Sequence, residues 1–221
     1  MNRTDIAKRI EITGIVPIVR APSAEVATKA ARAILAAGID VLEITMTVPN
    51  AVGLLRQLRD EIGKDVLLGA GTVLDADTAL ACIEAGAQFI VSPGFDLATI
   101  QATHALDKPC MPGVLTPTEV ITAWKAGADM AKIFPCSALG GASYLRALKA
   151  PLPQVKMMPT GGVDVTTAAD FIKAGAAALG VGAAVVDLKL LDKSGPGAIT
   201  EKCRELVEVV RVARSQGAAK G

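Results

Sequence analysis

The sequence predicts an α/β protein folded as a single (β/α)₈ barrel. Three observations support this: an Ala-Gly pair recurs before apolar segments, the pairs are evenly spaced, and helical patterns alternate with the apolar segments. The pairs are Ala37-Gly38, Ala85-Gly86, Ala126-Gly127 and Ala174-Gly175. Each glycine stands where a helix would end in a left-handed residue. The spacings of 48, 41 and 48 residues are about twice a strand–helix unit, so another strand lies in each gap.

Eight strands are expected in chain order, at residues 14–20, 41–46, 66–73, 89–94, 110–114, 130–135, 156–161 and 178–182. An extra helix over residues 3–12 precedes them. Ser23, the capping box Thr116–Glu119 and Asp164 are expected to start later helices. A doubly wound open sheet is the alternative, but no G-x-G-x-x-G motif follows the first strand. Residues 1–221 then form one domain, with a frayed tail from about residue 215.

The composition favours small-molecule chemistry. The 221 residues are 51% hydrophobic and carry a formal net charge of +1, without a basic block that would attract nucleic acid or an anionic membrane. No apolar stretch approaches the roughly 20 residues of a membrane span, and the charged start MNRTDIAKRIE lacks a signal-peptide core. We therefore expect a cytoplasmic protein with neither nucleic-acid nor membrane partners.

Cysteine and histidine are too few and too scattered for several kinds of site. Cys82, Cys110, Cys136 and Cys203 form no Cys-x-x-Cys pair, and His104 is the only histidine. A zinc site, a redox pair and a Ser-His or Cys-His nucleophile all lack their parts. No metal is expected.

Lys132 lies in the middle of the apolar segment Met130–Pro135. Burial disfavours the charged form of a lysine, which makes a neutral, nucleophilic amine available to form a Schiff base with a carbonyl. The alternative is a lysine at the rim of a strand, with its stem buried and its amine in water.

Glu43 is expected to face the same barrel interior. Alternation in its strand places Leu42, Ile44 and Met46 on one face and Glu43 on the other, and the apolar face should meet the helices. A Schiff-base reaction needs an acid/base beside the amine, which Glu43 would supply. A structural ion pair between Glu43 and Lys132 is the alternative.

Other polar and glycine-rich positions follow strand ends, where a barrel builds its active site. Arg20 closes the first strand and is a candidate for binding a carboxylate, or else a surface arginine. Thr160-Gly161-Gly162 and Gly180-Val181-Gly182 follow the last two strands, where barrels bind phosphate through backbone N–H groups. This placement indicates a phosphorylated substrate.

The motifs LEITMTVPNA, GAGTV, FIVSPG, MPGVLTPTE, KIFP and PTGGV occur in this order. Together they closely resemble the family of 2-keto-3-deoxy-6-phosphogluconate (KDPG) and 2-keto-4-hydroxyglutarate (KHG) aldolases. The resemblance extends from about Gly14 to the last helix. It implies a class I aldolase on a (β/α)₈ barrel, without metal or cofactor, that releases pyruvate and works as a homotrimer. The second product would be glyceraldehyde 3-phosphate or glyoxylate, which places the enzyme in Entner–Doudoroff carbohydrate metabolism.

The resemblance also implies roles for individual residues. Lys132 would form the Schiff base, and Glu43 would be the general acid/base. The residues expected to line the pyruvate pocket are Thr72, Pro93 and Phe134, and those facing the distal part of the substrate are Thr160, Gly161, Gly162, Gly182 and Ala183.

The chain departs from the family pattern in two places. Thr47 stands where one branch has an arginine, so carboxylate binding is assigned to Arg20, as in the other branch. Ala183 replaces a serine that many members have after the glycine of the last strand, which removes one hydroxyl from the phosphate site.

Three other functions remain open from the sequence. A 2-keto-3-deoxy-6-phosphogalactonate aldolase would use the same pocket. A phosphosugar isomerase or epimerase could use the same barrel, with Lys132 only balancing charge. A non-catalytic barrel is the third, and the presence of both Glu43 and Lys132 argues against it.

Overall fold

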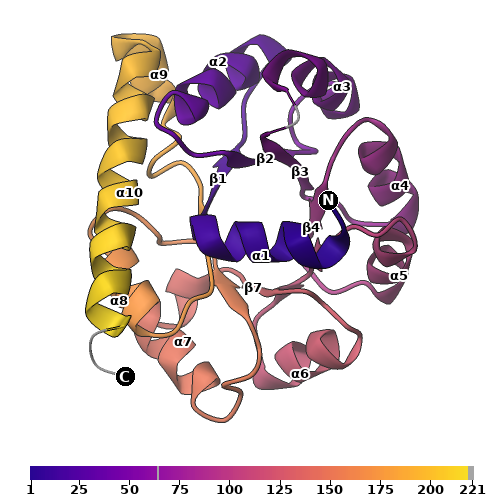
Figure 1. Cartoon of the computed structure of the whole chain (residues 1–221), viewed down its shortest axis with the longest axis vertical. Coiled ribbons are helices and arrows are strands. Elements are labelled where there is room, and N and C mark those ends of the chain that lie inside the picture. Colours follow the sequence, from indigo (N-terminus) through magenta and orange to yellow (C-terminus); the bar gives the residue numbers. More distant parts are fainter. Residues whose placement is uncertain (64, 219–221) are drawn as a thin grey trace.

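The computed structural model describes residues 1–63 and 65–218 (Figure 1). Its strands are β1 Ile15–Val19, β2 Val41–Thr45, β3 Leu67–Gly71, β4 Phe89–Val91, β5 Cys110–Met111, β6 Gly113–Val114, β7 Ala131–Ile133, β8 Met157–Pro159 and β9 Leu179–Val181. All strand pairs are parallel. One curled sheet has six strands in the order β5-β4-β3-β2-β1-β9, and a second sheet has the order β6-β7-β8.

Apart from α1, which lies across one end of the strands, the helices lie around the outside of the strands (Figure 1). They are α1 Arg3–Thr13, α2 Ala24–Leu35, α3 Ala51–Ile62, α4 Ala76–Glu84, α5 Leu97–Ala105, α6 Pro117–Lys125, α7 Ala142–Lys149, α8 Ala168–Lys173, α9 Leu188–Ser194 and α10 Pro196–Ala218, with a 3₁₀ turn η1 at Cys136–Leu139. The predicted alternation of strands and helices and the leading helix are therefore confirmed.

The predicted fifth strand, 110–114, is in two pieces, which corrects the expectation of a continuous strand. Pro112 separates β5 from β6, because proline has no N–H to donate to a sheet ladder. β5 pairs with β4, and β6 pairs with β7, so the break also separates the two sheets. On the other side, a parallel bridge between Thr160 and Gly180 joins the end of β8 to β9.

Most of the predicted helix boundaries are confirmed. The Ser23 side chain accepts a hydrogen bond from Val26 N–H, and Thr116 forms the expected capping box with Glu119. The glycines of the four Ala-Gly pairs all have positive φ, as predicted. The start of α8 was predicted wrongly: Asp164 accepts hydrogen bonds from Thr166 N–H and Thr167 N–H in a turn, and the helix begins at Ala168.

Two apolar clusters hold the fold together. The larger lies between the sheets and the helices and includes Leu42, Ile44, Ala131 and Ile133. The smaller lies on the inner face of the two sheets, toward the N-terminal ends of the strands, and includes Ile6 and Ile10 of α1. Its strand residues are Val16, Val41, Leu67, Phe89, Val91, Met111, Met130, Met158 and Ala178. α1 therefore covers one end of the strands and leaves the other end for a site.

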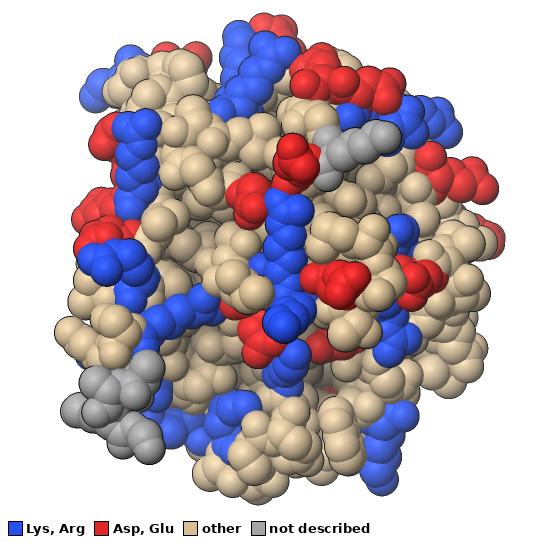
Figure 2. Space-filling view, viewed as in Figure 1, with Lys and Arg blue, Asp and Glu red and all other residues tan. Residues whose placement is uncertain are grey.

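Ion pairs fix α1 over that end. Lys156, which directly precedes β8, pairs with Glu11 at 2.6 Å, and Arg9 pairs with Asp40 at 2.5 Å. Figure 2 shows acidic and basic side chains interspersed around α1.

The C-terminal helix is longer than expected. α10 continues to Ala218, so residues 215–218 are helical rather than part of a frayed tail, and residues 219–221 lie outside the described residues. In the described residues, no helix is both long enough and apolar enough to cross a membrane.

Candidate functional site

Strand alternation turns Lys132 toward the inner face of the sheets, away from the surrounding helices. Ala131 and Ile133 of β7 pack outward in the larger apolar cluster, and Met130 lies in the smaller, interior cluster. Lys132 shares the interior face of Met130 but lies nearer the C-terminal end of β7. Its side chain is 5% exposed, so the amine is buried rather than placed in water at a strand rim.

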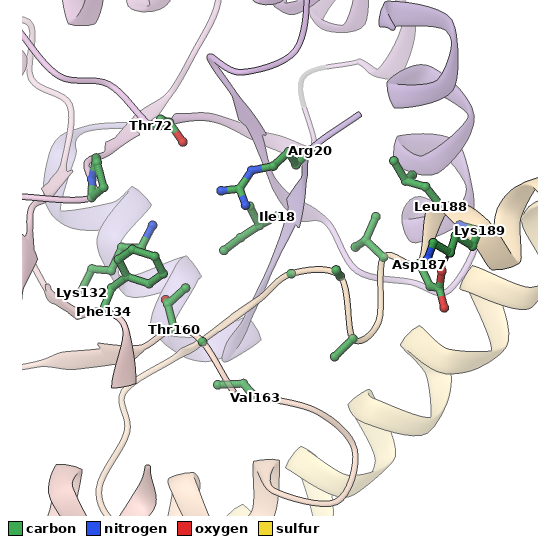
Figure 3. A pocket seen from close by; sticks show the side chains of 17 residues that line it. Ile18, Arg20, Thr72, Lys132, Phe134, Thr160, Val163, Asp187, Leu188 and Lys189 are labelled. Atoms are coloured by element: carbon green, nitrogen blue, oxygen red, sulfur yellow. Dashed lines mark hydrogen bonds between the residues drawn. The ribbon is translucent and has the colours of Figure 1, made fainter. Parts of the chain in front are cut away.

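A cavity of about 660 Å³ opens at the C-terminal ends of the strands. Figure 3 shows Arg20, Thr72, Lys132 and Thr160 around one space, with Asp187 and Lys189 on the wall opposite Lys132. Ten of the eleven predicted site residues line this cavity: Arg20, Thr72, Pro93, Lys132, Phe134, Thr160, Gly161, Gly162, Gly182 and Ala183. The structure therefore brings together residues from the ends of β1, β3, β4, β7, β8 and β9.

The amine of Lys132 lies 5.3 Å from the centre of the Phe134 ring, on the same face of the chain. Within the described residues it forms no ion pair, and in particular none with Glu43. The structural ion pair considered from the sequence is therefore absent. An amine with no hydrogen-bonded anion beside it is free to attack a carbonyl group.

Glu43 differs from the other predicted site residues because it does not line the cavity. Its side chain is 0% exposed, and neither carboxyl oxygen has a hydrogen-bond partner in the part of the chain that the structure describes. Burial raises the pKa of this carboxyl above 4.5, against the opposing charges of Lys132 and Arg20. Lys132 and Arg20, whose charges act on this carboxyl, both line the cavity, so Glu43 lies just beneath the cavity.

Two threonines at the cavity have unusual surroundings. Thr160 is 5% exposed, and its hydroxyl has no hydrogen-bond partner among residues 1–63 and 65–218. Thr72 has a φ of 58°, in the left-handed region that β-branched residues rarely adopt. Strained backbone conformations and buried hydroxyls without a partner lower stability, and they are concentrated at functional sites.

Arg20 is exposed, yet its guanidinium points into the cavity rather than away from the molecule (Figure 3). It follows Val16 and Ile18 on the interior face of β1. Its position allows it to meet an anionic group of a molecule bound at Lys132.

Sequence reasoning missed part of the cavity wall, formed by Ile18, Val163, Ala184, Val186, Asp187, Leu188 and Lys189. Ile18 could have been found, because it lies two residues before Arg20 on the same face of its strand. The residues at the start of α9 carry no such signal, since only the tertiary structure folds α9 against the cavity.

Comparison with known proteins identifies the family. A family model described as "KDPG and KHG aldolase" matches residues 6–202. The chain belongs to this family. The KHG/KDPG aldolase of Escherichia coli K12 is 33% identical over 91% of the chain and 95% of the relative. The 2-dehydro-3-deoxy-6-phosphogalactonate aldolase of the same organism is 36% identical over 76% of the chain and 82% of the relative.

A solved structure adds evidence on the chemistry. The KDPG aldolase of Legionella pneumophila, with pyruvate captured as a covalent carbinolamine intermediate, is similar with a TM-score of 0.81 and 30% identity. The match covers 91% of this chain and 97% of that one. The present chain is accordingly a class I, Schiff-base aldolase, and thus a lyase.

Proposed function

We propose that this aldolase cleaves 2-keto-3-deoxy-6-phosphogluconate into pyruvate and glyceraldehyde 3-phosphate, and also 2-keto-4-hydroxyglutarate into pyruvate and glyoxylate. The observation that supports this best is the buried Lys132 amine, which opens into a cavity that also holds the Arg20 guanidinium. A 2-keto acid presents a ketone and a carboxylate on adjacent carbons, and these two groups match the amine and the guanidinium.

In the proposed reaction, the Lys132 amine adds to the C2 ketone and forms a carbinolamine. Glu43 gives a proton to the departing water, and an iminium results. The C3–C4 bond then breaks, its electrons pass to the iminium, and the Glu43 carboxylate takes the proton of the C4 hydroxyl as the aldehyde leaves. The pyruvate enamine is reprotonated at C3, and water releases pyruvate and the free lysine. Because the iminium accepts the electrons, the reaction needs no metal or cofactor.

Thr72, Pro93 and Phe134 are proposed to enclose the pyruvate part of the substrate. All three line the cavity, and Thr72 and Phe134 lie on the same side of it as Lys132 (Figure 3). Thr160, Gly161, Gly162, Gly182 and Ala183 would face the distal part, where the backbone of the glycines lets a phosphate approach closely. Gly161 and Gly162 both have positive φ, a backbone conformation that favours glycine, in the turn that follows β8.

A phosphogalactonate substrate is the second candidate. The support is the 36% identity to the Escherichia coli aldolase named for it. The two sugar acids differ in configuration at one carbon. Both have the same ketone and carboxylate, so Lys132 and Arg20 could bind either of them.

We further propose that the two parallel sheets close into one (β/α)₈ barrel of a single domain. The Thr160–Gly180 bridge and the hydrogen bond from Ala177 N–H to Met157 O support contact on one side, and continuity through Pro112 supports it on the other. A homotrimer is proposed because the family resemblance implies it, and we place it in the cytoplasm as an expectation from the sequence. A role in the Entner–Doudoroff route follows from the proposed substrate.

Borohydride trapping tests the proposed function. Pyruvate plus borohydride should inactivate the protein irreversibly and leave one reduced pyruvate on Lys132, detected by peptide mass spectrometry. Lys132→Ala should abolish both trapping and cleavage, while Lys156→Ala, which changes a lysine at the opposite end of the strands, should preserve both. Label on another lysine would overturn the assignment.

A further inference from the structure

β3 contributes glycine at two successive positions that face the interior. Gly69 and Gly71 alternate with Leu68 and Ala70, which pack outward in the larger apolar cluster. Neither glycine has a positive φ, so any L-residue could adopt these backbone conformations. The absence of a side chain must therefore be explained by space rather than by backbone freedom.

Side chains from the two neighbouring strands fill both spaces. A Cβ atom on Gly69 would lie 2.6 Å from Cδ2 of Phe89, and closer still to the end of that ring. A Cβ atom on Gly71 would lie 2.6 Å from Cγ of Glu43, and closer still to Cδ and Oε1. The Phe89 ring thus fills the space beside Gly69, farther from the cavity. The Glu43 carboxyl fills the space beside Gly71, nearer the cavity.

The register shows that the Glu43 side chain leans toward the cavity. The Cα of Glu43 is paired with that of Gly69, whereas Gly71 is paired with Thr45, one interior level higher. Because the Phe89 ring blocks the space beside Gly69, the carboxyl extends upward to the space beside Gly71. No hydrogen bond from any described residue holds the carboxyl there.

We propose that Gly71 is a positioning residue: its missing side chain forms the pocket that holds the Glu43 carboxyl under the Lys132 amine. This inference rests on the proposed function of Glu43 as the acid/base. The backbone cannot retreat to make room, since Gly71 O accepts a hydrogen bond of 2.8 Å from Met46 N–H and Thr72 follows in a left-handed conformation. A methyl group on Gly71 therefore has to displace the carboxyl.

Gly71→Ala is the primary test. Displacing an acid/base by about 1 Å costs on the order of 10²-fold in rate, so kcat should fall about that far. Pyruvate should still be trapped on Lys132, but more slowly, because the amine and Arg20 are unchanged while Glu43 assists iminium formation. The pH dependence of kcat should also change, since the carboxyl would sit in new surroundings. Gly197→Ala is the matched control: its Cβ would meet nothing within 4 Å, and kcat should stay at the wild-type value.

A double-mutant cycle separates positioning from a general structural defect. In a Glu43→Gln background, Gly71→Ala should lower kcat by less than about threefold, because the group it displaces no longer carries a proton. Equal, multiplicative losses in both backgrounds would overturn the proposal. So would a folded Gly71→Ala variant with wild-type kcat and an unchanged pH profile.

A second variant covers the case in which Gly71→Ala does not fold. Glu43→Asp removes one methylene from the carboxyl side, so Gly71→Ala/Glu43→Asp should fold with a stability near that of Glu43→Asp alone. If the double variant also fails to fold, Glu43 is not what occupies the space and the inference is wrong. Failure of the proposed function has a different signature: the wild-type protein would show neither cleavage nor pyruvate on Lys132.

Discussion

The hydroxyl of Thr160 occupies the space where Gly180 lacks a side chain. A Cβ atom on Gly180 would lie 3.1 Å from Cβ of Thr160 and would overlap Oγ1. The two residues also form the bridge between β8 and β9. Although it is buried, the hydroxyl has no hydrogen-bond partner among the described residues, so it lowers stability unless a bound molecule uses it.

Thr160→Val should therefore stabilise the protein and impair it as an enzyme. Valine fills the same space without an unsatisfied hydroxyl, so the free energy of unfolding should rise by about 1 kcal/mol. The kcat/KM for cleavage should fall about tenfold, while pyruvate trapping on Lys132 stays unchanged. Urea unfolding and steady-state kinetics measure the two effects.

The matched control is Thr103→Val. Thr103 is also buried, but its hydroxyl donates a 2.7 Å hydrogen bond to Thr99 O. Removing a satisfied bond should lower the free energy of unfolding by about 1 kcal/mol. Two variants that shift stability in the same direction would contradict the assignment of the Thr160 hydroxyl to a ligand.

Glu43→Gln should lower kcat by roughly 10²–10⁴-fold with a much smaller effect on pyruvate binding, because glutamine keeps the shape but carries no transferable proton. Unchanged turnover would reduce Glu43 to a structural residue. Steady-state kinetics and the concentration dependence of trapping separate the two effects.

Glu43 should also affect how stability varies with pH. Burial raises its pKa in the folded state above 4.5, so the folded state holds this proton more tightly than the unfolded state does. Its contribution to stability is thus complete below pH 4.5 and is lost as pH rises through the folded-state pKa. Glutamine does not titrate, so the free energy of unfolding of Glu43→Gln should increase relative to that of wild type as the pH rises above 4.5. Urea unfolding at several pH values measures this difference. A constant difference would show that the pKa is not raised.

Arg20→Ala should weaken every 2-keto acid substrate to a similar degree, pyruvate included, because all of them share the carboxylate. A charged hydrogen bond of this kind is worth about tenfold or more in affinity. Arg32→Ala is the control, since Arg32 pairs with Glu61 on the outer helices at 2.8 Å and lines no part of the cavity. If Arg20→Ala weakens only the phosphorylated substrate, this arginine binds the phosphate instead.

Ile10→Ala should destabilise the fold without touching the chemistry. Ile10 is fully buried in the interior cluster at the end opposite the cavity, so the cavity left behind should cost about 2–5 kcal/mol. The kcat of the folded protein should equal that of wild type. Ile12→Ala, at a position 66% exposed on the same helix, should change stability by less than about 0.5 kcal/mol. A large loss of kcat in Ile10→Ala would show that α1 influences the site.

Local patterns in the sequence predicted the order of the elements and the interior position of the main site residues. Ser23 and Thr116 cap their helices because those side chains bond to backbone groups within three residues, which sequence alone specifies. Lys132 and Glu43 turn inward because strand alternation has a fixed period of two residues.

Relationships between distant segments required the tertiary structure. The sequence could not show that Pro112 splits a strand between two sheets, that Asp187 and Lys189 reach the cavity, or that Glu43 lies beneath the cavity rather than in its wall. These features depend on which side chains of different strands and helices compete for one space. The motif GAGTV marked Thr72 as a site residue, but the reason for its second glycine, Gly71, became visible only once the Glu43 carboxyl was found in its place. Sequence thus determined which residues face inward, because that follows from local backbone geometry. Tertiary packing decided how deep each one lies and what it touches, because those depend on volumes contributed by other strands.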